Sequence, residues 1–397
     1  MSERVAKAIQ EVQKAAEADH ARTGQAHVDL LDAVRKLTEA AETPAERLMR
    51  MRFQPIQNAA IRMAVESGVL ETIGAAKGKC VTSQELEKET GYDALLVTRF
   101  MRLVCYVGVV DEVGDGEYVA NPTTYLINTP PMIGGEKHHF DLFFPIGAKL
   151  PEYIREKKIH QFPNKEAGEF SPFHYTFKQS LFEFFDQNTD HQKWFGDYMS
   201  GRRAGFATWH ETFPFAEILG PDVKKGPNEI LLVDVAGNNG HEAVSLHESH
   251  PDLPGRIVCE DLPPVVDMMT KKGHHDKVEF IKYDFFTPQP IRGARAYYFR
   301  NICHDWPDDA CQKFLSQTAK SMEKGYSYIL IDDYVVPDTG ASLRASSMDM
   351  LMMFFCSGIE RTRKQWDKLL DSCGLEIVKI WGTRSDYEHV IQAQLKD

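Results

Sequence analysis

The sequence predicts an α/β protein with a Rossmann-like, doubly wound sheet at the C-terminus and an N-terminal helical region that contains a winged-helix unit. Apolar strand-like runs alternate with helical segments after residue 223, whereas the preceding half is mainly helical in its periodicity. A chain of 397 residues is also long enough for more than one domain. We expect segments at 1–129, 130–222 and 223–397, and the Gly/Pro/Lys stretch "GPDVKKGPN" (220–228) marks the last boundary.

The first 41 residues predict two amphipathic helices. Val5, Ile9 and Val12 recur at helical spacing, a similar series begins at Leu30, and "RTGQAH" (22–27) separates the two. The apolar faces of such helices need a cover. A second copy of the chain and the chain's own body fit the pattern equally well.

The next segment predicts a winged-helix unit. Thr43 followed by proline is a typical helix start, and we expect this helix to be interrupted near Pro55. Helices at 82–91 and 92–110 precede "VVDEVGDGEYVANP", which predicts two short strands around an Asp-Gly turn. Helix, turn, helix and hairpin is the order of a winged helix.

The charge of the chain argues against nucleic acid or an anionic membrane as a partner. The net charge is −12, and the second helix of the winged-helix unit offers only Arg99 and Arg102. The sequence has no apolar run with the form of a signal peptide, and none of the roughly 18 residues needed to span a bilayer. We therefore expect a soluble, cytoplasmic protein.

The seven cysteines are scattered along the chain and form no CxxC pair. No compact group of cysteine and histidine has the spacing of a zinc site. Reduced thiols of an intracellular protein explain these cysteines best.

The middle segment, 130–222, is rich in aromatic residues and histidines. The stretches "HHFDLFFPI", "FHYTF" and "FATWHETFPF" predict irregular helices. Ordinary core packing and a pocket for a flat organic ligand both account for this composition, and both can hold at once.

Five strand-like runs follow the linker, and helical segments separate several of them. Alternation of this kind predicts a doubly wound sheet. "LEIVKIWG" and "HVIQAQL" near the end predict a closing hairpin. The five predicted strands are 229–237, 255–262, 278–284, 294–305 and 327–337.

Three successive strand ends carry groups that suit a nucleoside. In "VDVAGNNGH", Gly237 and Gly240 let the backbone approach a ligand, although the loop lacks the GxGxxG pattern of nicotinamide enzymes. Asp261 ends the next strand and is suited to ribose hydroxyls. Asp284 and Phe285 follow the third strand and are suited to an adenine amine and its ring. Together they predict a nucleoside ligand without a pyrophosphate.

A histidine and several acids converge on the same edge. The fourth predicted strand delivers His304, the fifth ends in Asp332 and Asp333, and "SGIERT" carries Glu360. A lone histidine at a strand end is more often structural. An imidazole held by carboxylates keeps one tautomer and gains basicity, so the group predicts a general base for a hydroxyl.

The motifs "YYFRNICHDWPDD", "VDVAGNNGH", "EDLPPV", "KYDFF", "DDYVVP" and "GIERTRKQW" resemble the class I S-adenosylmethionine-dependent O-methyltransferases of the caffeic-acid type, fungal branch. The resemblance covers the whole chain. It implies a dimerising N-terminal domain, an aromatic-rich segment that lines the substrate, and a C-terminal domain that binds S-adenosylmethionine. It also implies methyl transfer to a hydroxyl of a hydrophobic small molecule, without a metal, by a homodimer.

Residue by residue, the resemblance implies that His304 is the catalytic base and that Asp333 and Glu360 flank it. Asp333 stands where glutamate is common, and we expect it to reach His304 less directly. The implied cofactor contacts are Gly237, Asp261, Asp284, Phe285 and Arg300. The family's loop is usually V-G-G-G-x-G, whereas this chain has V-A-G-N-N-G.

A second reaction class shares the resemblance. Some fungal relatives keep the cofactor pocket but catalyse pericyclic or dehydration steps, with the sulfonium as a fixed positive charge. They resemble this chain in "ETPAERLMRMRF" and in a histidine near "HHFDLFF", where His138 and His139 fall as expected substrate-lining residues. The retained base and both acids favour methylation.

Overall fold

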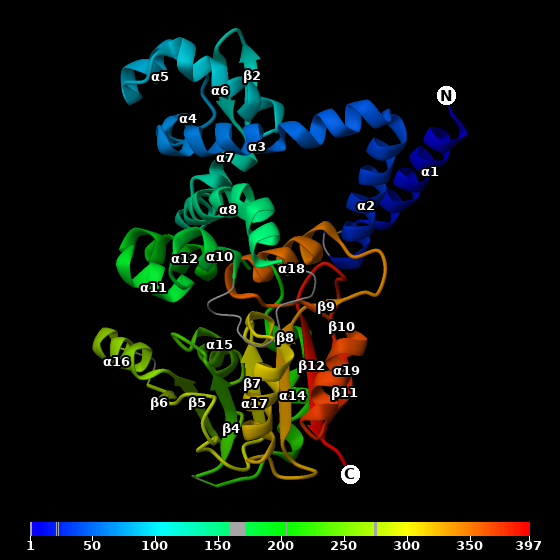
Figure 1. Cartoon of the computed structure of the whole chain (residues 1–397), viewed down its shortest axis with the longest axis vertical. Coiled ribbons are helices and arrows are strands. Elements are labelled where there is room, and N and C mark those ends of the chain that lie inside the picture. The colour runs from blue at the N-terminus through cyan, green and yellow to red at the C-terminus, as the bar shows by residue number, and fades with distance from the viewer. Residues whose placement is uncertain are drawn as a thin grey trace. The chain divides into compact units, whose positions relative to one another are not determined.

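The computed structural model describes residues 2–20, 22, 24–158, 171–203, 205–226, 228–273 and 276–397 (Figure 1). Contacts between residues divide the chain into two units, each assembled from separate segments. No helix among the described residues is long and apolar enough to cross a membrane. The first unit comprises 1–14, 32–152 and 180–206, and the second comprises 15–31, 153–179 and 207–397.

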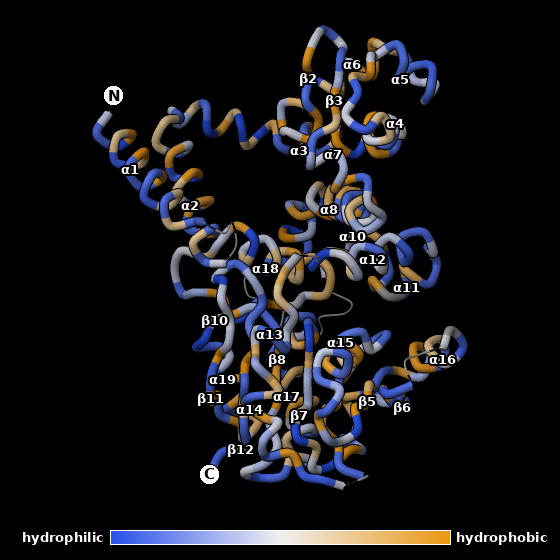
Figure 2. The backbone as a smooth tube through the Cα atoms, turned by 180° about the vertical axis from the view of Figure 1, so that it is seen from behind, coloured by the Kyte–Doolittle hydropathy of each residue, from blue (hydrophilic) through white to orange (hydrophobic). Residues whose placement is uncertain are grey.

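The N-terminal helices are α1 (Glu3–Ala18), α2 (Gly24–Ala41) and α3 (Pro44–Glu66). All three alternate between hydrophilic and hydrophobic residues along the tube in Figure 2. A capping box starts α3, because Thr43 Oγ1 accepts from Glu46 N at 3.3 Å and Glu46 Oε2 accepts from Thr43 N at 2.8 Å. The predicted interruption near Pro55 is wrong: α3 runs through it, since losing one backbone donor does not break a 23-residue helix.

Helices and a small sheet in the first unit have the order of a winged helix. The three strands pair antiparallel in the order β1-β3-β2. A core of buried side chains, among them Leu70, Val97, Met101 and Tyr118, holds the helices against the strands. The elements are α4 (Val69–Ala75), β1 (Val81–Thr82), α5 (Ser83–Thr90), α6 (Ala94–Tyr106), β2 (Val110–Gly114), β3 (Glu117–Ala120) and α7 (Pro122–Ile127).

The described parts of the aromatic-rich middle, 130–158, 171–203 and 205–222, are mainly helical, as the sequence predicted. Its longest helix, α8, has 28 residues and contains two prolines. The elements are α8 (Pro130–Lys157), α10 (Pro172–Phe177), α11 (Leu181–Gln187), α12 (Thr189–Gly201), α13 (Trp209–Thr212), α14 (Phe215–Ile218) and the 3-10 turn η1 (Gly220–Asp222).

A seven-stranded sheet dominates the second unit, with the strand order β11-β12-β8-β7-β4-β5-β6. The five strands from β8 to β6 are parallel, and β12 joins antiparallel to both β8 and β11. The chain leaves β4 toward β5 and β6 and then returns to β7, so a topological switch point lies beside β4. The strands are β4 (Ile230–Val235), β5 (Arg256–Asp261), β6 (Val278–Lys282), β7 (Ala296–Arg300), β8 (Tyr328–Asp333), β11 (Leu375–Trp381) and β12 (His389–Leu395).

Helices cover both faces of this sheet (Figure 1). One face packs on α17 and α19 through Phe314 and Trp366, and the other packs on α13, α14 and α15 through residues such as Trp209. The remaining elements are α15 (His241–Ser249), α16 (Pro263–Lys272), η2 (Cys303–Asp305), α17 (Asp308–Ala319), α18 (Leu343–Cys356), α19 (Arg363–Ser372) and the parallel pair β9 (Val335–Val336) and β10 (Arg361–Thr362).

Candidate active site

The carboxyl edge of the parallel strands brings together five of the residues that the sequence predicted. β5 ends at Asp261, β7 ends at Arg300 and β8 ends at Asp333. Gly237 follows β4 by two residues, and His304 lies in η2, just beyond β7. Because neighbouring parallel strands end on the same side, these groups share one edge at the switch point.

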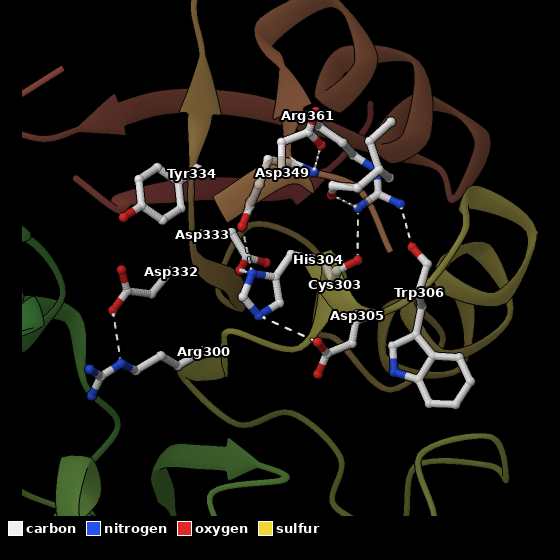
Figure 3. Close-up of polar contacts among 12 residues, drawn as sticks. Arg300, Cys303, His304, Asp305, Trp306, Asp332, Asp333, Tyr334, Asp349 and Arg361 are labelled. Carbon is white, nitrogen blue, oxygen red and sulfur yellow. Dashed lines mark hydrogen bonds and ion pairs between the residues drawn. The ribbon is translucent and has the colours of Figure 1, made fainter. Parts of the chain in front are cut away.

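His304 is buried and surrounded by carboxylates (Figure 3). Its Nδ1 lies 2.8 Å from Glu360 Oε1 and 3.7 Å from Asp333 Oδ1. Its Nε2 lies 3.6 Å from Asp305 Oδ1. Glu360 is thus within hydrogen-bond distance, whereas Asp333 reaches the ring only as an ion pair. When Nδ1–H donates to Glu360, the neutral ring presents Nε2 as a proton acceptor.

Charge controls the protonation of this group. Burial alone lowers the pKa of His304, but attraction to Glu360, Asp305 and Asp333 outweighs burial and raises it to about 10. Burial raises the pKa of Asp333 well above its usual value, and the nearby imidazole offsets part of that rise. Neither oxygen of Asp333 has a hydrogen-bond partner among the described residues. The carboxylates around the ring therefore favour the protonated form of the imidazole.

The same three side chains also have the residue types of a metal site. Ligand atoms of His304, Asp333 and Glu360 lie within 4.8 Å of one another. His304 Nδ1, however, already lies within hydrogen-bond distance of Glu360, an arrangement that suits a base and its carboxylate. The absence of a metal remains a prediction.

The loop after β4 has an unusual backbone for its residues. Ala236 and Asn238 have φ values of 58° and 52°, in the left-handed region that favours glycine. Asn238 N donates to Asp261 Oδ2 at 2.8 Å, which ties the loop to β5. A Cβ on Gly237 would overlap the side chain of Asp234. The loop therefore keeps a glycine-like path although two of its residues are not glycine.

The donors and acceptors around this loop fit S-adenosylmethionine, which carries a sulfonium, an ammonium, a carboxylate and ribose hydroxyls. Asp234 is buried, its Oδ2 has no hydrogen-bond partner among the described residues, and burial raises its pKa to about 7. Asp261 accepts from two backbone N–H groups and retains lone pairs for hydroxyls. Arg300 pairs with Glu242 and lies 3.7 Å from Asp332 Oδ2 (Figure 3). Carboxylates and a guanidinium are thus both present to bind a ligand that carries positive and negative groups.

Aromatic rings follow β6. Phe285 packs against Phe314 with ring centroids 4.8 Å apart and against Trp306 at 6.1 Å, edge to face. Asp284 is exposed, and its Oδ1 accepts from Phe286 N at 3.0 Å. The adenine contacts expected from Asp284 and Phe285 remain predictions.

His138 and His139 belong to the first unit. Burial lowers the pKa of His138 to about 3 and also lowers that of His139, so both rings are neutral near pH 7. His138 lies 5.0 Å from the ring of Phe195, and His139 lies 4.8 Å from that of Tyr198. Their substrate-lining role stays a prediction.

Sequence reasoning missed several residues that hold the site. Asp349 Oδ1 accepts from Glu360 N at 2.9 Å, Tyr298 donates to Asp332 Oδ2 at 2.8 Å, and Arg361 binds the turn that carries His304. Arg361 lies within "GIERTRKQW" and Asp305 within "YYFRNICHDWPDD", and an arginine directly after Glu360 was the available signal. Tyr298 also lies within "YYFRNICHDWPDD", but nothing in the sequence indicated its bond to Asp332, and no motif contained Asp349.

Comparison with known proteins identifies the family of the chain. A family model described as an O-methyltransferase domain matches residues 160–376. Demethylsterigmatocystin 6-O-methyltransferase of Aspergillus flavus is 30% identical over 346 residues, which cover 87% of each chain. A solved pericyclic reaction enzyme and LepI in complex with S-adenosylmethionine each superpose with a TM-score of 0.86 at 26% identity and cover 99% of both chains.

These matches confirm the predicted cofactor class and the predicted fold class. The family model alone spans more than half of the chain. Relatives at about 30% identity span most of it. The chain therefore belongs to the O-methyltransferase family that the sequence motifs resembled.

Proposed function

We propose that this protein transfers the methyl group of S-adenosylmethionine to a hydroxyl of a hydrophobic aromatic or enolic small molecule, with His304 as the general base. The contact of His304 Nδ1 with Glu360 Oε1 at 2.8 Å carries this proposal. It holds the ring at the sheet edge where the Gly237 loop begins. It also leaves Nε2 to receive the proton of an acceptor hydroxyl.

Bound S-adenosylmethionine would supply a methyl group on a positively charged sulfur. Gly237, Asp261, Asp284, Phe285 and Arg300 would hold it. A positive charge close to His304 lowers the pKa of the imidazole, because two like charges repel. The ring can then lose its proton near neutral pH and accept one from the substrate, which contributes typically 10²–10⁴-fold in rate.

The flanking acids stabilise the imidazolium that forms when the substrate proton arrives. Glu360 would do so through its hydrogen bond, and Asp333, at 3.7 Å from Nδ1, would do so in its ionised form, which the imidazolium favours. Both are buried, so their attraction to the ring is poorly screened by solvent. Alignment of the acceptor oxygen with the methyl group is the other contribution expected from the protein.

His304→Ala tests the role of the base. We expect methyl transfer from labelled cofactor to fall by at least about 100-fold, because the proton acceptor is lost. Cofactor affinity, measured by calorimetry, should change little, and its retention serves as the folding control. Substantial turnover in this variant would contradict the assignment of His304.

A pericyclic or dehydration reaction with the cofactor unchanged is the second candidate. The similarity to a solved pericyclic reaction enzyme over 99% of both chains favours it specifically. Incubation of trial substrates with methyl-labelled cofactor separates the two reactions. Label in the product supports methyl transfer, whereas a new product with no label transferred supports the alternative.

We also propose that the protein is a homodimer formed through its N-terminal helices. Helix α3 exposes about half the surface of each of several large apolar side chains, and a second copy of the chain would cover them. These residues are Leu48, Met49, Met51, Phe53 and Ile56.

A further inference from the structure

Arg361 is a buried arginine that the proposed reaction does not use. Its Nη1 donates to the carbonyl of Cys303 at 2.7 Å, and its Nη2 donates to the carbonyl of Trp306 at 2.8 Å (Figure 3). Its Nε donates to Asp308 Oδ1 at 2.8 Å. The guanidinium therefore binds both ends of the turn that contains His304.

The two residues before Arg361 hold the middle of the same turn. Ile359 N donates to the carbonyl of His304 at 2.9 Å. Glu360 Oε1 lies 2.8 Å from the ring of His304. Ile359 thus holds the backbone of His304, Glu360 holds its side chain, and Arg361 holds the residues on either side of it.

Close backbone packing supports the same arrangement. A Cβ on Gly358 would overlap the carbonyl oxygen of His304, so the two segments approach as closely as a glycine permits. The approach brings Arg361 within reach of two carbonyls at once. Arginine suits this task because its planar fork donates in fixed directions and stays charged at any working pH.

We propose that Arg361 is a positioning residue: by holding the 303–306 turn, it keeps His304 Nδ1 against Glu360 and Nε2 toward the acceptor hydroxyl. This inference rests on the proposed role of His304 as the base. Without the hydrogen bonds from Arg361 to the carbonyls of Cys303 and Trp306, the turn can move away from 358–361. A displacement of about 1 Å at a reacting group can cost about 100-fold in rate.

Arg361→Met removes the donors and keeps an unbranched side chain, whereas Arg363→Met is the matched control. Arg363 lies on the exposed start of α19, where it pairs with Asp367 at 3.0 Å. We expect Arg361→Met to lower kcat by about 100-fold while the KM for cofactor stays within about 2-fold. Arg363→Met should match the wild type, and Arg361→Lys should be intermediate, since lysine lacks the fork.

A titration of the His304 ring by NMR, with labelled histidine and a His304→Gln sample for assignment, gives a readout independent of turnover. The pKa of His304 should fall in Arg361→Met, because the imidazolium loses its close contact with Glu360. An unchanged titration in both Arg361 variants would overturn the inference. If Arg361→Met does not fold, the titration of Arg361→Lys decides by the same criterion. If the wild type transfers no methyl group, the proposed function fails, but the titration still tests whether Arg361 positions His304.

Discussion

Glu260 gives the sharpest prediction about stability, because it is a buried acid with half of its carboxylate unsatisfied. Its Oε2 accepts from Gln289 Nε2 at 2.8 Å, and its Oε1 has no hydrogen-bond partner among the described residues. Burial raises its pKa from 4.5 to about 7, and the bond from Gln289 offsets part of that rise. The folded protein thus holds this proton more tightly than the unfolded chain does.

The raised pKa of Glu260 makes the free energy of unfolding depend on pH, because the folded and unfolded states bind the proton with different affinity. Stability from this group is fully present below about pH 4.5 and is lost as the pH rises through about 7. The difference between these pKa values, at about 1.4 kcal/mol for each unit, corresponds to roughly 3 kcal/mol. Glu260→Gln keeps an oxygen that can accept from Gln289, and its side chain cannot ionise. This variant should therefore not lose stability from position 260 as the pH rises.

Urea unfolding between pH 4.5 and 8, followed by tryptophan fluorescence, measures this effect. From pH 4.5 to 8, the free energy of unfolding of Glu260→Gln should rise relative to that of the wild type by roughly 3 kcal/mol. Glu376→Gln is the matched control, because Glu376 is exposed and also accepts from a glutamine amide at 2.8 Å. A gap between Glu260→Gln and the wild type that does not change with pH would refute the argument.

Three further changes probe the loop, the cofactor site and the N-terminal helices. Ala236→Gly relieves a left-handed alanine and should raise the free energy of unfolding by up to about 1 kcal/mol, whereas a loss would mean that the alanine is not strained. Asp261→Asn removes a charged acceptor and should weaken S-adenosylmethionine binding by about 10- to 100-fold in calorimetry, and an unchanged affinity would argue against this contact. Phe53→Glu places a charge on the exposed face of α3 and should convert a dimer to a monomer in light scattering. A wild type that is already monomeric would contradict the dimer.

Local patterns predicted much of the fold. The Asp-Gly turn indicated the β2–β3 hairpin, and the two final apolar runs pair as β11 and β12. Pro55 was misleading because propensity treats a proline as a break, whereas a long helix can absorb one missing donor. Alternating strands and helices predicted the sheet, since parallel strands need helical crossovers.

The candidate site was predictable where its residues end strands. Asp261, Arg300 and Asp333 occupy strand ends, so topology alone brings them to one edge. The contact of Glu360 with His304 joins residues 56 positions apart, and the motif resemblance rather than spacing indicated it. Asp349 could not be found, because its bond to the backbone of Glu360 depends on how α18 packs.

The alternation of side chains along β8 constrains how this gene can vary. Asp332 contacts Tyr298 and Arg300 on one side of the strand, while its neighbour Asp333 contacts His304 on the other. Removing or adding one codon within β8 would turn both acids toward the opposite faces of the sheet and disable both neighbourhoods together. A change of two codons would keep the faces but would move both acids by about 7 Å along the strand, away from their partners. The length of β8 should therefore resist change, a constraint that laboratory libraries built on this scaffold would also have to respect.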